Sequence, residues 1–167
     1  MNDTYKKIRA GGLVRRWHTI PTINDETVAH HSWGVATVLL ELWPDCSRDL
    51  LIAALYHDVH EHVTGDIPKP AFWRSPELGT LVDCIKDEVN RELGILPSLT
   101  IEEQKQLAIA DMFDLCWRCL EEIQLGNKGF KEVLANAMNW LWDERLGGEA
   151  YQMRTDLRCL MKTEGML

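Results

Sequence analysis

No stretch of this 167-residue chain keeps the alternation of apolar and polar residues that a half-buried strand requires. Apolar residues instead recur at helical spacing, in segments separated by glycine, proline and N-capping residues. The pattern predicts an all-α fold of six or seven helices. The length suits one domain, which we take as residues 1–167.

Capping and turn residues predict where these helices begin and end. Asn24 or Asp25, Ser47 and Ser75 are expected N-caps. Thr100 with a glutamate three residues later is typical of a capping box. The segment GDIPKP, with two prolines, is expected to be a rigid loop. The predicted helices cover about 3–13, 25–43, 47–65, 75–94, 100–126, 128–146 and 149–162.

Charge and composition exclude several classes of protein. A formal net charge of −8 repels nucleic acid backbones, so a nucleic-acid-binding module is not expected. No segment has the roughly 20 apolar residues of a membrane helix. The N-terminus has no apolar signal region, so we expect a cytoplasmic protein. The five cysteines are interpreted as buried thiols, including the Cys116 and Cys119 pair inside a predicted helix.

Histidines gather in one part of the chain. All six lie in the first 62 residues, and His57 and Asp58 are adjacent inside an apolar segment. A histidine on the preceding helix and a carboxylate on a later one would complete a site for a first-row divalent metal. Spacing alone leaves both His30 and His31 open as the third ligand. An isolated histidine is more often a core residue, but the density of this cluster favours a metal site.

Three blocks of sequence resemble one family. The order His…His-Asp…Asp is similar to the signature of the HD phosphohydrolase superfamily. The blocks ETVAHHSWGVA, YHDVHEHVTGDIPKP and AIADMFDLCWRCLEEIQLGN resemble its bacterial 5′-deoxyribonucleotidase branch, over about residues 13–127. The resemblance implies an HD-domain helical bundle and a divalent metal ion, with Co, Mn, Zn, Fe and Mg all compatible with the ligands. The metal ligands that it implies are His31, His57, Asp58 and Asp111.

The resemblance also assigns catalytic roles. Glu61 matches the acid that orients or deprotonates the attacking water, and it lies four residues after His57, on the same face of the expected helix. Asp66 matches a second acid near the sugar or leaving group. Arg16 matches a phosphate-binding arginine, whose guanidinium suits bidentate contact with phosphate. Relatives often carry lysine where this chain has Ala108, so one phosphate contact is expected to be missing or to come from another subunit.

Four further residues are expected to bind the substrate. Trp17 and Ile20 could enclose a purine base, with a core position as the alternative for Trp17. Pro70 ends the loop that lies against the sugar in relatives and could exclude a 2′-hydroxyl. Lys69 could meet a phosphate tail, with a solvated lysine as the alternative.

Two phosphohydrolase activities fit these residues. A dNTP triphosphohydrolase that prefers dATP and releases tripolyphosphate is favoured, because compact phage-type relatives with this activity resemble the chain in length and in the Arg-Trp block. A deoxynucleoside 5′-monophosphatase is the alternative, which Ala108 favours because a triphosphate needs more positive charge. A non-catalytic nucleotide-binding HD module and a structural helical adaptor are further alternatives. The apolar, tryptophan-rich C-terminal helices predict a homo-oligomer.

Overall fold

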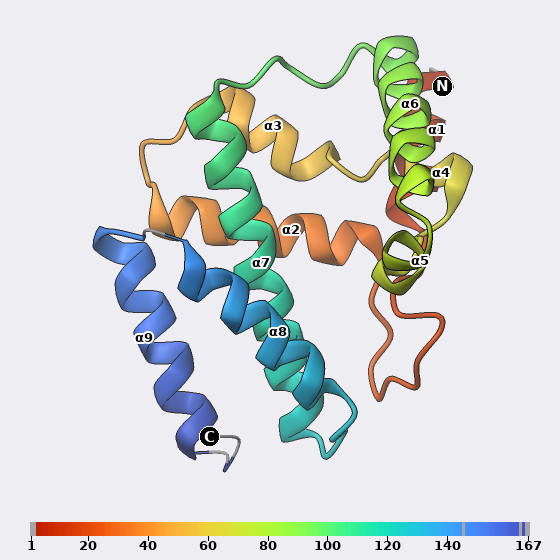
Figure 1. Ribbon diagram of the computed structural model, residues 1–167. Coiled ribbons are helices and arrows are strands. Elements are labelled where there is room, and N and C mark those ends of the chain that lie inside the picture. The colour runs from red at the N-terminus through yellow and green to blue at the C-terminus, as the bar shows by residue number, and fades with distance from the viewer. Residues whose placement is uncertain (1–2, 145, 164, 166–167) are drawn as a thin grey trace.

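The computed structural model describes residues 3–144, 146–163 and 165, and within them every regular element is a helix. Figure 1 shows α2 crossing the centre of the molecule with α7 lying across it. The all-α prediction is confirmed, but the described residues form nine helices rather than six or seven. The helices are α1 (Asp3–Gly12), α2 (Val28–Leu42), α3 (Arg48–Tyr56), α4 (Glu61–Thr64), α5 (Lys69–Arg74), α6 (Pro76–Leu93), α7 (Ile101–Gln124), α8 (Phe130–Asp143) and α9 (Gly148–Thr163).

The extra helices arise where one continuous helix was predicted over 47–65. That helix ends at Tyr56, and a tight turn over residues 57–60 leads into α4. In this turn the backbone N–H of Glu61 donates to the carbonyl of Asp58, three residues back, at 3.0 Å. The Nδ1 atoms of His57, His60 and His62 each lie 2.8–3.2 Å from a carbonyl oxygen three residues back. These side-chain bonds compete with the α-helical ladder and favour the break.

Most caps agree with the sequence. The Ser47 hydroxyl accepts from the Leu50 N–H at 3.0 Å, and the Thr100 capping box is present. Helix α6 begins at Pro76 and ends at Gly94, whose φ of 60° is a left-handed conformation that glycine adopts freely. One cap was wrong: Thr27, rather than Asn24 or Asp25, precedes α2 and accepts from the His30 N–H. The last two residues of the GDIPKP segment are also helical, because Lys69 begins α5.

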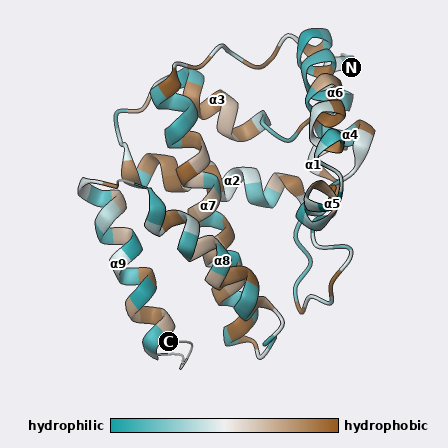
Figure 2. Ribbon diagram, in the orientation of Figure 1, coloured by the Kyte–Doolittle hydropathy of each residue, from teal (hydrophilic) through white to brown (hydrophobic). Residues whose placement is uncertain are grey.

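The main core lies between α2, α3, α7, α8 and α9. Figure 2 shows the apolar residues concentrated along α2 and α7, where these helices cross. Phe113, Leu39 and Leu50 are fully buried there, and so are Cys116 and Cys119. Burial raises the pKa of both thiols, which supports their interpretation as packing residues. The prediction that all five cysteines are buried was wrong for Cys84 and Cys159, which are exposed. A smaller cluster around Val59, Val89 and Leu93 joins the 57–60 turn to α6.

The described C-terminal residues do not test the predicted homo-oligomer. Leu141 is buried, whereas Trp142 is 40% exposed. The guanidinium carbons of Arg154 and Arg158 lie 4.1 and 5.1 Å from the centroid of the Trp142 ring.

Within the described residues, no helix is both long and apolar enough to cross a membrane.

The long segment between α1 and α2 is held by a buried carboxylate on α7. Glu122 is fully buried and accepts hydrogen bonds from the backbone N–H groups of Ile23, at 2.8 Å, and Asn24, at 3.0 Å. It also accepts from Arg118, at 2.8 Å, and from the side-chain amide of Asn127, at 2.7 Å. Burial alone would raise the pKa of Glu122, but these donors outweigh it and lower the pKa overall.

We therefore expect Glu122→Ala to lower the free energy of unfolding by about 3 kcal/mol at pH 7, because it leaves a buried arginine and two backbone donors without their acceptor. A lowered folded-state pKa stabilises the protein above the ordinary pKa of glutamate, and this contribution disappears as the pH falls through the folded-state pKa. The difference between wild type and variant should therefore shrink in acid. Urea denaturation over a pH series measures it.

Glu121 provides the matched control because it is the next residue on α7 and its side chain is 58% exposed. Glu121→Ala should change the free energy of unfolding by less than about 0.5 kcal/mol. Equal effects of the two substitutions at pH 7 would contradict the role given to Glu122.

Candidate metal centre and phosphate site

Three of the four predicted ligands come together at the junction of α2, α3 and α4. His31 lies in the first turn of α2, and His57 and Asp58 occupy the turn after α3. One donor atom from each of these residues lies within 4.8 Å of the other two. His57 Nε2 is 3.2 Å from Asp58 Oδ2, and the two imidazole centroids are 5.2 Å apart. The spacing is that of side chains that could share one ion.

Asp111, the fourth predicted ligand, projects from α7 next to this group. It is not a member of the 4.8 Å set, but its Oδ1 lies 3.1 Å from His31 Nε2. It is also the most exposed of the four, with a side-chain exposure of 47%. Asp111 is therefore the predicted ligand that is most accessible to solvent.

Unpaired buried nitrogens indicate what the group can bind. The Nε2 atoms of His31 and His57 are both buried, and among the described residues neither makes a hydrogen bond of good geometry. The Nδ1 atoms of both rings are satisfied, by Asp114 at 2.6 Å and by the Ala54 carbonyl at 2.8 Å. Two imidazole nitrogens that converge beside carboxylates are a donor set that suits a divalent first-row metal.

The charges in the site depend on one another. Burial would lower the pKa of His31, but contacts with Asp111 and Asp114 outweigh it and raise the pKa to about 9. Burial would raise the pKa of the Asp58 carboxyl, but His57, His31 and Arg16 hold it well below its usual range. Asp58 therefore remains an anion at neutral pH and can attract a cation.

Arg16 is positioned by the segment before α2. Its backbone N–H donates to the Glu26 carbonyl at 3.0 Å, and residues 15 and 27 form an antiparallel bridge. The guanidinium Nε lies 3.1 Å from Glu26 Oε2, and Nη1 lies 3.5 Å from Asp58 Oδ2. The arginine is thus held beside the candidate ligands, where a phosphate contact was predicted.

Glu61 also faces this group, although not for the reason expected. Because the helix breaks after Tyr56, Glu61 begins a new helix instead of sharing a face of one helix with His57. Its carboxylate is buried, and Oε2 has no hydrogen-bond partner among the described residues. Burial, reinforced by Asp58 and Asp66, raises the pKa of Glu61 to about 8. A buried, unpaired acid beside the ligands can act on water there.

Asp66 contacts the segment that carries Arg16. Its Oδ2 accepts from the backbone N–H of Trp17 at 3.2 Å and lies 3.8 Å from His18 Nδ1. Trp17 has a φ of 62°, which is strained for a residue with a side chain. Asp66 therefore holds the strained segment that carries Arg16, besides lying near the site.

The other predicted substrate residues divide into two groups. The Trp17 indole N–H donates to Glu26 Oε2 at 2.6 Å, and its ring packs edge-on against Phe130 at 5.0 Å between centroids. These contacts favour its interpretation as a core residue. Ile20 is 37% exposed. Lys69 and Pro70 are exposed in the first turn of α5.

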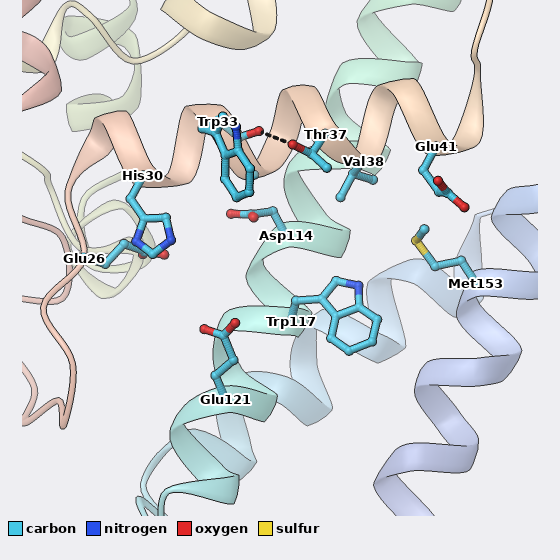
Figure 3. Close-up of a pocket in the computed structure, with 11 residues that line it drawn as sticks. Glu26, His30, Trp33, Thr37, Val38, Glu41, Asp114, Trp117, Glu121 and Met153 are labelled. Atoms are coloured by element: carbon cyan, nitrogen blue, oxygen red, sulfur yellow. Dashed lines mark hydrogen bonds between the residues drawn. The ribbon is translucent and has the colours of Figure 1, made fainter.

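Two functional candidates were missed in the sequence. Glu26 is only 5% exposed and binds both Arg16 and the Trp17 indole. Asp114 binds His31. Both also line a groove of about 280 Å³ along α2 and α7, which Figure 3 shows with Trp33 and Trp117 on its walls. The position of Asp114 one helical turn after Asp111 was the available signal. Glu26 gave none.

Comparison with known proteins identifies the family of the chain. The family model for 5′-deoxynucleotidases of the YfbR-like type matches residues 5–147. The chain belongs to the YfbR-like 5′-deoxynucleotidase family. The match confirms the predicted resemblance and extends well beyond the three sequence blocks.

Individual members of the YfbR-like family are distant in sequence. A 5′-deoxynucleotidase from Yersinia pseudotuberculosis is 26% identical over 153 aligned positions, covering 77% of this chain and 78% of the relative. One from Vibrio vulnificus is 27% identical over 142 positions, covering 71% and 73%.

Solved structures share the fold. An HD-domain phosphohydrolase from Listeria innocua has a TM-score of 0.76 at 22% identity, covering 97% of this chain and 90% of its own. The HD phosphohydrolase DatZ of cyanophage S-2L, bound to dA and one catalytic Zn²⁺ ion, has a TM-score of 0.67 at 20% identity, covering 100% and 99%. At these identities the likeness establishes the HD fold, as the sequence predicted.

Proposed function

We propose that this chain is a metal-dependent hydrolase of deoxynucleoside 5′-monophosphates. The observation that carries the proposal is the placement of Arg16, whose guanidinium lies 3.5 Å from Asp58 Oδ2. The same oxygen lies 3.2 Å from His57 Nε2 and 3.8 Å from His31 Nε2. A phosphate held by Arg16 would lie next to the ligand group. The names of the YfbR-like relatives support the same activity.

His31, His57, Asp58 and Asp111 would hold the metal. When bound, a divalent ion lowers the pKa of water and polarises a phosphoryl oxygen. Glu61 would orient the attacking water and accept its proton, because its buried Oε2 has no other partner among the described residues. Arg16 would stabilise the negative charge that builds on the phosphoryl oxygens.

The balance of charge favours a single phosphate. Four carboxylates lie close to the Arg16 guanidinium, those of Glu26, Asp58, Asp66 and Asp111. This chain has Ala108 where relatives often carry a lysine. A triphosphate carries more negative charge than a monophosphate and needs more cations than this arrangement supplies. This reverses the order of the two activities expected from sequence, in which the triphosphohydrolase came first.

A dNTP triphosphohydrolase with preference for dATP remains the second candidate. The observation in its favour is Lys69, an exposed cation in the first turn of α5, three residues after Asp66. It could meet the distal phosphates of a longer substrate. Pro70 beside it would contact the sugar, and Ile20, which is 37% exposed, the base. The contacts of Trp17 with Glu26 and Phe130 favour a core role over the base contact expected from sequence.

Product analysis separates the two activities. We expect the protein, incubated with Mn²⁺ or Co²⁺ and a panel of nucleotides, to release inorganic phosphate from dNMPs and to leave their ribose counterparts intact. Anion-exchange chromatography resolves the products. Tripolyphosphate and deoxyadenosine from dATP, with dAMP untouched, would select the second candidate instead. Metal binding without turnover of any nucleotide would make the chain a binding module.

A further inference from the structure

The ring of His31 is held from its far side by a carboxylate that the catalytic scheme does not use. His31 is 1% exposed, and its Nδ1 lies 2.6 Å from Oδ2 of Asp114. Asp114 follows Asp111 by one helical turn on α7. Helix α7 therefore supplies one carboxylate to each nitrogen of this imidazole.

This contact matters because the two ring nitrogens are not independent. A neutral imidazole that donates Nδ1–H to a carboxylate has its lone pair on Nε2, the atom that faces the ligand group, and a metal ion binds there in place of a proton. The negative charge also makes Nε2 a stronger electron donor, and the hydrogen bond restricts rotation of the ring. His57 has an equivalent bond, but its acceptor is the Ala54 carbonyl, which no substitution can remove.

The approach of Asp114 depends on a glycine. Gly34 lies one turn after His31 on α2, where α7 crosses it. A Cβ at residue 34 would overlap Oδ1 of Asp114 and would lie 2.8 Å from its Cγ, closer than any ordinary contact. Figure 3 shows Asp114 reaching from α7 toward α2 in this region. Any side chain at residue 34 would therefore push the carboxylate away from His31.

We propose that Asp114 is a positioning residue that fixes His31 for metal binding, and that Gly34 provides the space it requires. The inference rests on the metal centre of the proposed function and adds the carboxylate and glycine that prepare one of its ligands. It does not depend on which deoxynucleotide is hydrolysed.

Metal affinity tests this role directly. We expect Asp114→Ala to weaken Co²⁺ binding by about 10- to 100-fold in isothermal titration calorimetry. Asp114→Asn keeps an oxygen that can accept from Nδ1–H but loses the charge, so its affinity should lie between those of Asp114→Ala and wild type. The visible absorption of bound Co²⁺, which reports ligand geometry, should change in Asp114→Ala and remain close to wild type in Asp114→Asn.

The two residues should act through the same contact. Gly34→Ala alone should weaken Co²⁺ binding as Asp114→Ala does, because the new methyl group displaces the carboxylate. In the Gly34→Ala/Asp114→Ala double variant the carboxylate is already gone, so the loss should be no greater than for Asp114→Ala alone. The melting temperature of each metal-free variant checks that the fold is retained.

Glu41 provides the control, because it is exposed, acidic and lines the same groove. Glu41→Gln should bind Co²⁺ as wild type does. Wild-type affinity and absorption in Asp114→Ala would overturn the role of Asp114, and additive losses in the double variant would overturn that of Gly34. If wild type itself bound no Co²⁺, the metal centre would be wrong and this role with it.

Discussion

Asp58→Ala is expected to remove metal binding and hydrolysis together, with activity reduced by at least about four orders of magnitude. Asp58 Oδ2 lies 3.2 Å from His57 Nε2, 3.8 Å from His31 Nε2 and 3.5 Å from Arg16 Nη1. It is thus the anion on which both histidines and the arginine proposed to bind phosphate converge. Without it, three groups that can carry positive charge would face one another and repel an incoming metal ion. Metal content by mass spectrometry and initial rates with a dNMP measure the two effects.

Two further variants make this result interpretable. Asp58→Asn keeps the volume of the side chain and should also lose the metal, because a neutral amide is a poor ligand for it. Asp45→Ala removes an exposed aspartate at the opposite end of α2 and should behave as wild type. A fully folded Asp58→Ala protein that keeps its metal and its rate would contradict the proposed ligand set.

Glu61→Gln is expected to keep the metal but to lower kcat by about two to four orders of magnitude. The substitution preserves the size of a side chain that is 9% exposed, so the fold should tolerate it. It removes the carboxylate that can accept a proton from water. The two substitutions can be told apart, because Asp58→Ala should lose both the metal and the activity, whereas Glu61→Gln should lose activity alone.

Glu102 is the control for this substitution because it is an exposed glutamate in the first turn of α7. Glu102→Gln should keep the wild-type kcat and metal content. Hydrolysis at the wild-type rate by Glu61→Gln would show that another group handles the proton, and loss of its metal would make Glu61 a ligand instead.

Much of the fold could be predicted because its signals are local. The Ser47 cap, the Thr100 capping box and the left-handed Gly94 each depend on a few neighbouring residues. The break after Tyr56 could not be predicted in this way. Apolar periodicity continues through residues 57–63, whereas the turn depends on histidine side chains bonding to carbonyls and on packing against α1, where Gly11 lies close to the Val59 carbonyl.

The candidate site, like the fold, could be predicted from the sequence only in part. The spacing and the family resemblance led to His31, His57 and Asp58, which the structure brings together. The resemblance could not reveal the residues that support them. Glu26 and Asp114 act through contacts across the fold, and the role of Gly34 depends on how closely α7 crosses α2. Phe130, against which the Trp17 indole packs, is also distant from it in sequence.

An anomalous difference map from a crystal grown with Co²⁺, recorded at the cobalt edge, would show directly whether these residues bind a metal ion. We expect one strong peak within bonding distance of Nε2 of His31, Nε2 of His57 and a carboxylate oxygen of Asp58, with Asp111 turned toward it. The same crystal form of Asp58→Ala should lack the peak. A well-ordered wild-type site without anomalous density, or cobalt bound only elsewhere on the molecule, would contradict the proposed metal centre.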